Sequence, residues 1–91
     1  MILVFRAHAL QRMFEREIAV HDVENVVADG KAIEEYQDDF PFPSRLILGF
    51  VSSRPIHVVA AENKQEGSTI IVTVYEPSPN QWKPGFEVRE Q

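Results

Sequence analysis

The sequence predicts a single α+β domain over residues 1–91, with two N-terminal helices packed on one face of a mostly antiparallel sheet. Three observations lead to this fold class. A chain of 91 residues is long enough for one small hydrophobic core. Helical periodicity is confined to residues 7–29, and the β-rich segments then follow one another with short turns, as antiparallel neighbours do. We therefore expect the order β-α-α-β-β-β-β and a sheet of about four or five strands.

The first two elements have clear local signals. Residues 1–6 are rich in β-forming side chains and predict a short strand. Residues 7–18 predict an amphipathic helix, because at about 100° per residue its apolar and basic side chains separate onto two sides. The apolar side holds Leu10, Met13 and Phe14, and the other side holds His8, Arg12 and Arg16.

The remaining elements follow from valine stripes, β-branched runs and turn residues. A second helix over 20–29 carries an apolar stripe, and Gly30 is expected as its left-handed C-terminal cap. Residues 38–44 predict a loop because two prolines lie within it, residues 62–67 predict a hairpin loop, and residues 77–91 predict a mostly irregular tail anchored by Trp82 and Phe86. The strands are expected at 31–37, 45–51, 56–61 and 68–76.

The expected core combines the apolar sides of both helices with alternate strand residues. It consists of Leu10, Met13, Phe14, Val23, Val26, Leu46, Leu48, Val58, Ile70 and Val72.

Composition limits the function classes. The chain has no cysteine, which excludes disulfides and thiolate chemistry and is compatible with the cytoplasm. The apolar start, residues 1–5, is too short for a signal peptide or a membrane span. The net charge is −5, which argues against tight, non-specific duplex binding. Yet residues 1–16 hold three arginines against one glutamate, whereas residues 17–40 hold eight acids against one lysine.

The basic side of the first helix is the main functional candidate. His8, Arg12 and Arg16 are spaced by four residues and form one ridge. Arginines suit phosphate oxygens, and a histidine moves protons near neutral pH. Such a set is sufficient for metal-free RNA cleavage, in which the 2′-hydroxyl is the nucleophile. A solvated helix face is the alternative, and the helix pattern alone favours it.

Two further side chains are candidates for the same chemistry. His57 interrupts the apolar run "PIHVVAA", either as a hydrogen-bonded, half-buried side chain or as an acid–base group. Tyr75 ends the last strand, either as an edge aromatic or as a proton carrier. The three histidines lack the spacing of metal ligands, so we expect no metal and no other cofactor.

Four stretches occur in order and resemble one family. They are "HALQRMFEREI", "VENVVADGKAIEEYQDDFPFPSRLILGF", "PIHVVAA" and "IIVTVYEPSPNQW". The chain resembles domain-of-unknown-function family 4258 over roughly residues 5 to 83, and that family is similar to RelE-like and MqsR-like toxins of toxin–antitoxin systems. The resemblance implies a metal-independent endoribonuclease and an antitoxin partner, such as a small zinc-finger protein. It assigns His8, Arg12, Arg16, His57 and Tyr75 to the site. Glu17 stands where many relatives have glycine.

Three functional hypotheses remain open at this stage. The first is a toxin-like endoribonuclease, the second is a non-catalytic module that docks a partner on the basic ridge, and the third is an RNA-binding regulator without chemistry. Homo-oligomers stay open, and no membrane partner is expected. For a catalytic site we expect His8 and Arg12 to lie within reach of His57 or Tyr75, around one concave surface.

Overall fold

The computed structural model describes all 91 residues as two helices packed on a five-stranded sheet. The strand order is β1-β5-β4-β3-β2; β1 runs parallel to β5, and the other neighbours are antiparallel. The α+β prediction and its element order are therefore confirmed. The elements are β1 (Ile2–Phe5), α1 (Ala7–Arg16), α2 (Val20–Asp29), β2 (Lys31–Tyr36), β3 (Ser44–Val51), β4 (Arg54–Asn63) and β5 (Ser68–Tyr75).

Most element boundaries agree with the sequence, and β4 differs most. It begins at Arg54 rather than at 56 and ends at Asn63 rather than at 61. Pro55 can join it because the ladder with β5 starts only at His57, so Pro55 has a strand neighbour on one side alone. Neither helix is long and apolar enough to cross a membrane.

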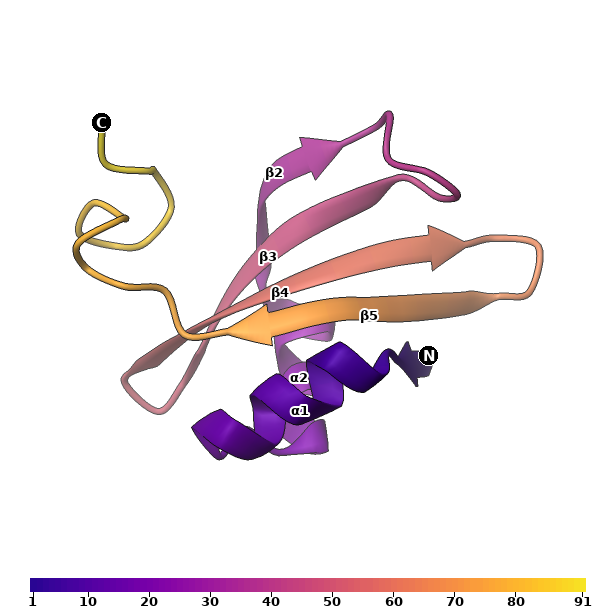
Figure 1. Ribbon diagram of the computed structural model, residues 1–91, viewed down its shortest axis with the longest axis horizontal. Coiled ribbons are helices and arrows are strands. Elements are labelled where there is room, and N and C mark those ends of the chain that lie inside the picture. The colour runs from indigo at the N-terminus through magenta and orange to yellow at the C-terminus, as the bar shows by residue number, and fades with distance from the viewer.

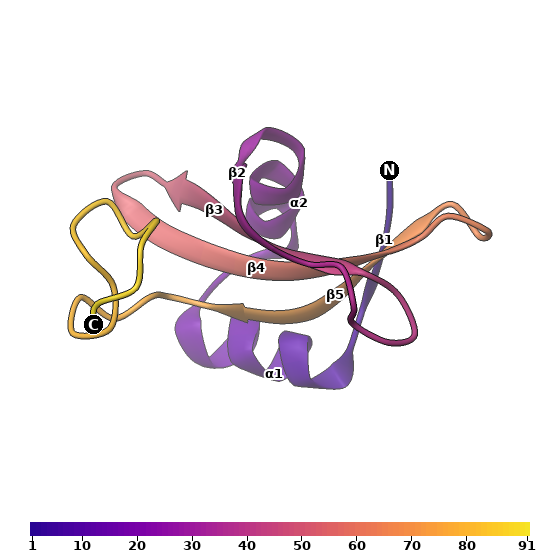
Figure 2. The same cartoon turned by 90° about the horizontal axis from the view of Figure 1, so that it is seen from above.

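Both helices cover the same face of the sheet, which we call the helix face. Figure 1 shows the two helices below the strands, with α1 along β5. Figure 2, a view from above, looks onto the side of the sheet away from the helices and shows the tail at one end of the sheet. We call this second side the open face. The core under the helices consists of Ala9, Met13, Ile18, Val23, Val26, Val27, Ile47, Ile56, Val58, Ala60, Ile71 and Val74.

The expected core is correct for six residues and wrong for four. Met13, Val23, Val26, Leu46, Leu48 and Val58 are buried. In α1 the stripe that faces the sheet runs through Ala9 and Met13, so Leu10 lies on its flank and Phe14 is 86% exposed. In β5 an irregularity opposite Val59 and Ala60 shifts the alternation, so Ile71 and Val74 are buried while Ile70 and Val72 are only half-buried.

The end of α1 is fixed by a clamp from β4. The guanidinium of Arg54 donates to the main-chain oxygens of Arg16 and Glu17, and its Nε lies 2.9 Å from Glu76 Oε1. A cation at the last carbonyls of a helix also opposes the negative end of the helix dipole. This contact sets the C-terminus of α1 beside the junction of β4 and β5.

The two helix ends correct the expectation for Gly30. Its φ is −76°, so it is extended rather than a left-handed cap. Glycine is needed there for space, since a Cβ would lie 2.6 Å from the main-chain oxygen of Leu48 and would also meet that of Val26. The left-handed cap belongs to α1 instead, where Glu17 has φ 55° and ψ 48°. A glycine at this position would adopt the conformation without strain.

We predict that Glu17→Gly stabilises the protein by about 0.5–1 kcal/mol, because it relieves a left-handed conformation that costs a side chain roughly 1–2 kcal/mol. Glu15→Gly, in the last turns of the same helix, is the matched control and should destabilise by about 1 kcal/mol. Urea denaturation of the two variants measures both effects. Equal losses in both variants would show that the Glu17 backbone carries no strain.

Candidate functional site

The basic ridge of α1 is exposed and does not contact the rest of the protein through its charged groups. His8, Arg12 and Arg16 all lie at the surface, and none of their side chains makes an ion pair or a hydrogen bond within the chain. The sequence therefore placed these three residues on one side of the helix correctly. The ridge offers three unpaired basic side chains to an external anion.

His57 lies on the opposite face of the sheet from this ridge. Its neighbours Ile56 and Val58 in β4 belong to the core under the helices, and alternation turns His57 toward the open face. Tyr75 is its register partner in β5 and shares that face. The prediction of one concave surface that joins His8 and Arg12 to His57 or Tyr75 is therefore wrong. The cause is that neighbouring residues of β4 point to opposite faces of the sheet, and the sequence did not show which of them face the helices.

His57 is fully buried, and both of its ring nitrogens have partners. Nε2 lies 2.9 Å from the main-chain oxygen of Phe86, and Nδ1 lies 3.1 Å from the hydroxyl of Tyr75. Because a carbonyl oxygen only accepts, the proton of the neutral ring sits on Nε2, and Nδ1 accepts from the Tyr75 hydroxyl. The Trp82 ring packs edge-on, with 4.5 Å between centroids. His57 and Tyr75 thus form a dyad beneath the tail.

Burial shifts the pKa of both members of the dyad. Loss of solvation lowers the pKa of His57, against the opposing effect of its bond to Phe86, so the ring is neutral at pH 7. Loss of solvation also raises the pKa of Tyr75, which keeps its phenol protonated. A neutral imidazole that accepts from a phenol is an acid–base pair in its resting state.

A second group of side chains lies beside the dyad on the open face. Arg89, from the tail, donates two hydrogen bonds of 3.1 Å to the carboxylate of Glu34 in β2. The hydroxyl of Tyr36 donates to the same carboxylate at 2.5 Å. Arg89 also lies 4.6 Å from the centre of the Trp82 ring, a cation–π contact that ties this group to the ring packed on His57.

The charges of this second group act on each other and on the dyad. The bond from Arg89 holds the pKa of Glu34 below its usual value, against the opposing effect of burial. Burial, followed by the bond to Glu34, raises the pKa of Tyr36 to about 12. The fields of Glu34 and Arg89 also reach His57, in opposite directions. Because every group with a shifted pKa lies here, we define these five residues as the open-face cluster: Glu34, Tyr36, His57, Tyr75 and Arg89.

Sequence reasoning missed three members of the cluster. Glu34 and Tyr36 carried a usable signal, since residues two apart in a strand share a face and such a pair can bond directly. Arg89 carried none, because nothing in an irregular tail predicts which strand it will contact. No group of three or more histidine, aspartate or glutamate side chains comes together in a way that could hold a metal ion.

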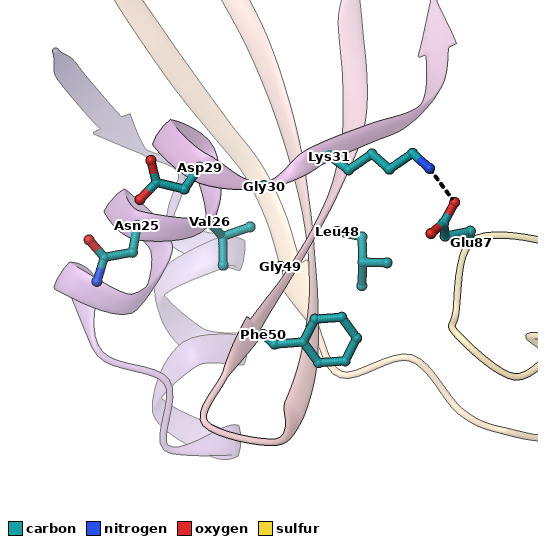
Figure 3. A pocket seen from close by; sticks show the side chains of 9 residues that line it. All are labelled: Asn25, Val26, Asp29, Gly30, Lys31, Leu48, Gly49, Phe50 and Glu87. Carbon is teal, nitrogen blue, oxygen red and sulfur yellow. Dashed lines mark hydrogen bonds and ion pairs between the residues drawn. The ribbon is translucent and has the colours of Figure 1, made fainter.

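A well-formed hollow lies apart from the cluster. Its volume is about 380 Å³, and it lies between the C-terminal part of α2 and the edge of β3 (Figure 3). Its charged groups include the ion pair of Lys31 and Glu87, 2.7 Å apart, and Asp29 at its rim. It contains no pair of groups suited to proton transfer, so we place the candidate site at the open-face cluster.

We predict that the dyad makes stability depend on pH. The pKa of His57 is lower in the folded state than its unfolded value of about 6.5, so near pH 6 the unfolded chain binds the extra proton. The free energy of unfolding should therefore rise between about pH 5 and pH 7 and then level off. Urea denaturation across this range should show a smaller rise for His57→Gln, which does not titrate. An unchanged slope in that variant would assign the effect to other groups.

The comparisons with known proteins identify the family. The model of the domain of unknown function DUF4258 matches residues 5–76. No curated protein and no solved structure matches the chain. The matched span runs from the end of β1 to the residue after β5. It contains both helices, strands β2 to β5 and four of the five members of the cluster. The chain belongs to the DUF4258 family.

Proposed function

We propose that the protein is a metal-independent endoribonuclease that acts through the open-face cluster. The observation that carries the proposal is the dyad, in which a buried neutral histidine accepts a hydrogen bond from a half-buried tyrosine hydroxyl. RNA cleavage by the 2′-hydroxyl needs only proton transfers and charge stabilisation on the phosphate. The resemblance to toxins of toxin–antitoxin systems is consistent with this reaction.

In the proposed mechanism Tyr75 touches the substrate and His57 acts behind it. The Tyr75 oxygen takes the proton of the 2′-hydroxyl while its own proton passes to Nδ1 of His57. The 2′-oxygen bonds to phosphorus, and the bond to the 5′-oxygen breaks. The resulting imidazolium remains bonded to the Phe86 carbonyl through Nε2. Because Tyr75 carries the proton, His57 has no need to reach solvent.

The other three members of the cluster supply positive charge and hold it in place. Arg89 uses Nε and Nη2 for Glu34, which leaves Nη1 for a phosphate oxygen, and its side chain is more than half exposed. Glu34 holds the guanidinium in place. Tyr36, which lies beside Glu34 on β2, donates its hydroxyl proton to that carboxylate and helps to hold it, so the leaving 5′-oxygen takes its proton from water. His8, Arg12 and Arg16 take no part in this mechanism, since they lie on the other face.

We predict that Tyr75→Phe lowers the cleavage rate by about 10²-fold or more, because it removes the proton carrier and keeps the ring. Cleavage of several RNAs, with and without ribosomes, is measured in excess chelator, and thermal melts check folding. Arg12→Ala, on the far face, is the control and should retain full activity. Activity that disappears with chelator, or an unaffected Tyr75→Phe, contradicts the mechanism. A folded wild type that cleaves no RNA removes the nuclease proposal altogether.

A second candidate function is the docking of an acidic protein on α1. The specific observation is that the ridge holds three basic side chains without internal partners in a chain of net charge −5. An antitoxin encoded beside this chain is a partner suited to this surface, and the open-face cluster then has a structural role only.

We predict that Arg12→Glu combined with Arg16→Glu weakens binding of an adjacent-gene zinc-finger protein by about 10-fold or more, since charge reversal places like charges across the contact. Isothermal titration of the co-purified partner measures the affinity. Arg45→Glu combined with Lys64→Glu, on β3 and just after β4, is the charge-matched control and should bind as the wild type does. Equal affinities for both variants would place the contact elsewhere.

A further inference from the structure

The loop between β2 and β3 presents an unpartnered aromatic ring on the open face. Phe40 is 95% exposed, the most exposed large apolar side chain in the molecule, and Phe42 beside it is half-buried. The loop borders a small pocket of about 140 Å³ that is also lined by Ser44 and Ala61. Ala61 lies an even number of positions after His57 in β4, so both side chains point to the same face of the sheet. The pocket therefore opens on the same face as the dyad.

An arginine without a partner completes this pocket. Arg6 follows β1, where Leu3 and Phe5 pack toward the helices, so alternation turns Arg6 to the open face. Its guanidinium makes no ion pair or hydrogen bond within the chain. The carboxylate of Asp39 also lines the pocket; its Oδ2 accepts from the Ser44 hydroxyl at 2.5 Å, and it makes no ion pair with Arg6.

The pocket and the dyad lie along the same two strands. His57 and Tyr75 are one register pair of β4 and β5, and Ala61 and Ile70 are another. The two pairs are four positions apart along β4, which corresponds to roughly 13 Å at the rise of an antiparallel strand. A short single strand of nucleic acid spans that length.

We propose that Arg6 and Phe40 form a nucleotide subsite for single-stranded RNA, in which a base stacks on Phe40 and a phosphate contacts Arg6. This inference rests on the proposed function and names the part of the substrate that lies outside the reacting phosphate. Stacking on an exposed aromatic ring beside an arginine is how single strands bind without duplex contacts. A duplex keeps its bases stacked on each other, so it leaves no base face for Phe40.

A protein partner is the competing occupant, and the pocket chemistry favours RNA. The pocket pairs one freely exposed ring with one unpaired guanidinium, which matches the alternation of base and phosphate in a strand. Leu10 and Phe14 on α1 are also exposed and lie one helical turn apart. They lie on the helix face, away from the dyad, and Phe14 therefore serves as an internal control.

The experiment measures binding separately from cleavage. The probe is a short fluorescein-labelled oligouridylate with 2′-O-methyl riboses, which the 2′-hydroxyl reaction cannot cleave, and its anisotropy is followed at low salt. Phe40→Ala should weaken binding by about 5-fold to 100-fold, the range of one stacked base. Phe40→Trp should restore binding, and Phe14→Ala should leave it within about 2-fold of the wild type. Arg6→Gln should weaken binding and its salt dependence, whereas Arg12→Gln should not.

The outcomes distinguish the subsite from the nuclease proposal. Weaker binding by Phe40→Ala supports the subsite, whether or not the wild type cleaves RNA. Active cleavage together with equal probe binding by the wild type and Phe40→Ala overturns the subsite and leaves the nuclease proposal standing. Absence of binding by the folded wild type also overturns the subsite. A Phe40→Ala variant that changes only self-association in sedimentation velocity assigns the loop to protein contacts and overturns it as well.

Discussion

The structure depends on the burial of β4 on both of its faces. Ile56, Val58 and Ala60 face the helices, and His57 between them faces a tail that excludes water. A buried imidazole is costly unless both nitrogens are bonded. Tyr75 from the neighbouring strand and the Phe86 carbonyl from the tail satisfy them. The tail has little regular structure of its own, and this pair of bonds, together with the Trp82 ring, explains why it lies where it does.

The sheet consequently separates two groups of arginines onto opposite faces. Arg12 and Arg16 lie on a helix beneath the sheet, whereas Arg89 lies above it against Glu34. The arginines also differ in what they do. Arg54 and Arg89 are committed to carboxylates and join distant segments, but those of the ridge have no internal partner. In a chain of net charge −5, the unpaired arginines are the positions available to an external anion.

The open face combines a closed end and an accessible end. At the closed end the tail covers His57, Tyr75 is half-buried beside it, and the shifted pKa values of both follow from this burial. At the other end the loop before β3 leaves Phe40 uncovered. Strands β4 and β5 connect the two ends through a ladder that is interrupted by one irregularity opposite Val59 and Ala60. The sheet therefore fixes the distance between the exposed ring of Phe40 and the dyad.

The sequence by itself determined the order of the elements, the boundaries of α2 and the grouping of the ridge residues, because caps, turns and helical periodicity are local properties. It also singled out His57 and Tyr75 as unusual in their strands. Only the tertiary structure decided which face each strand residue occupies. One irregularity in β5 places Ile71 and Val74 in the core in place of Ile70 and Val72. In β4, Ile56 and Val58 face the helices, so His57 between them points away from α1. The contact of Arg89 with Glu34 spans 55 residues, and no local pattern encodes such a pairing; it exists because burying His57 draws the tail across the sheet.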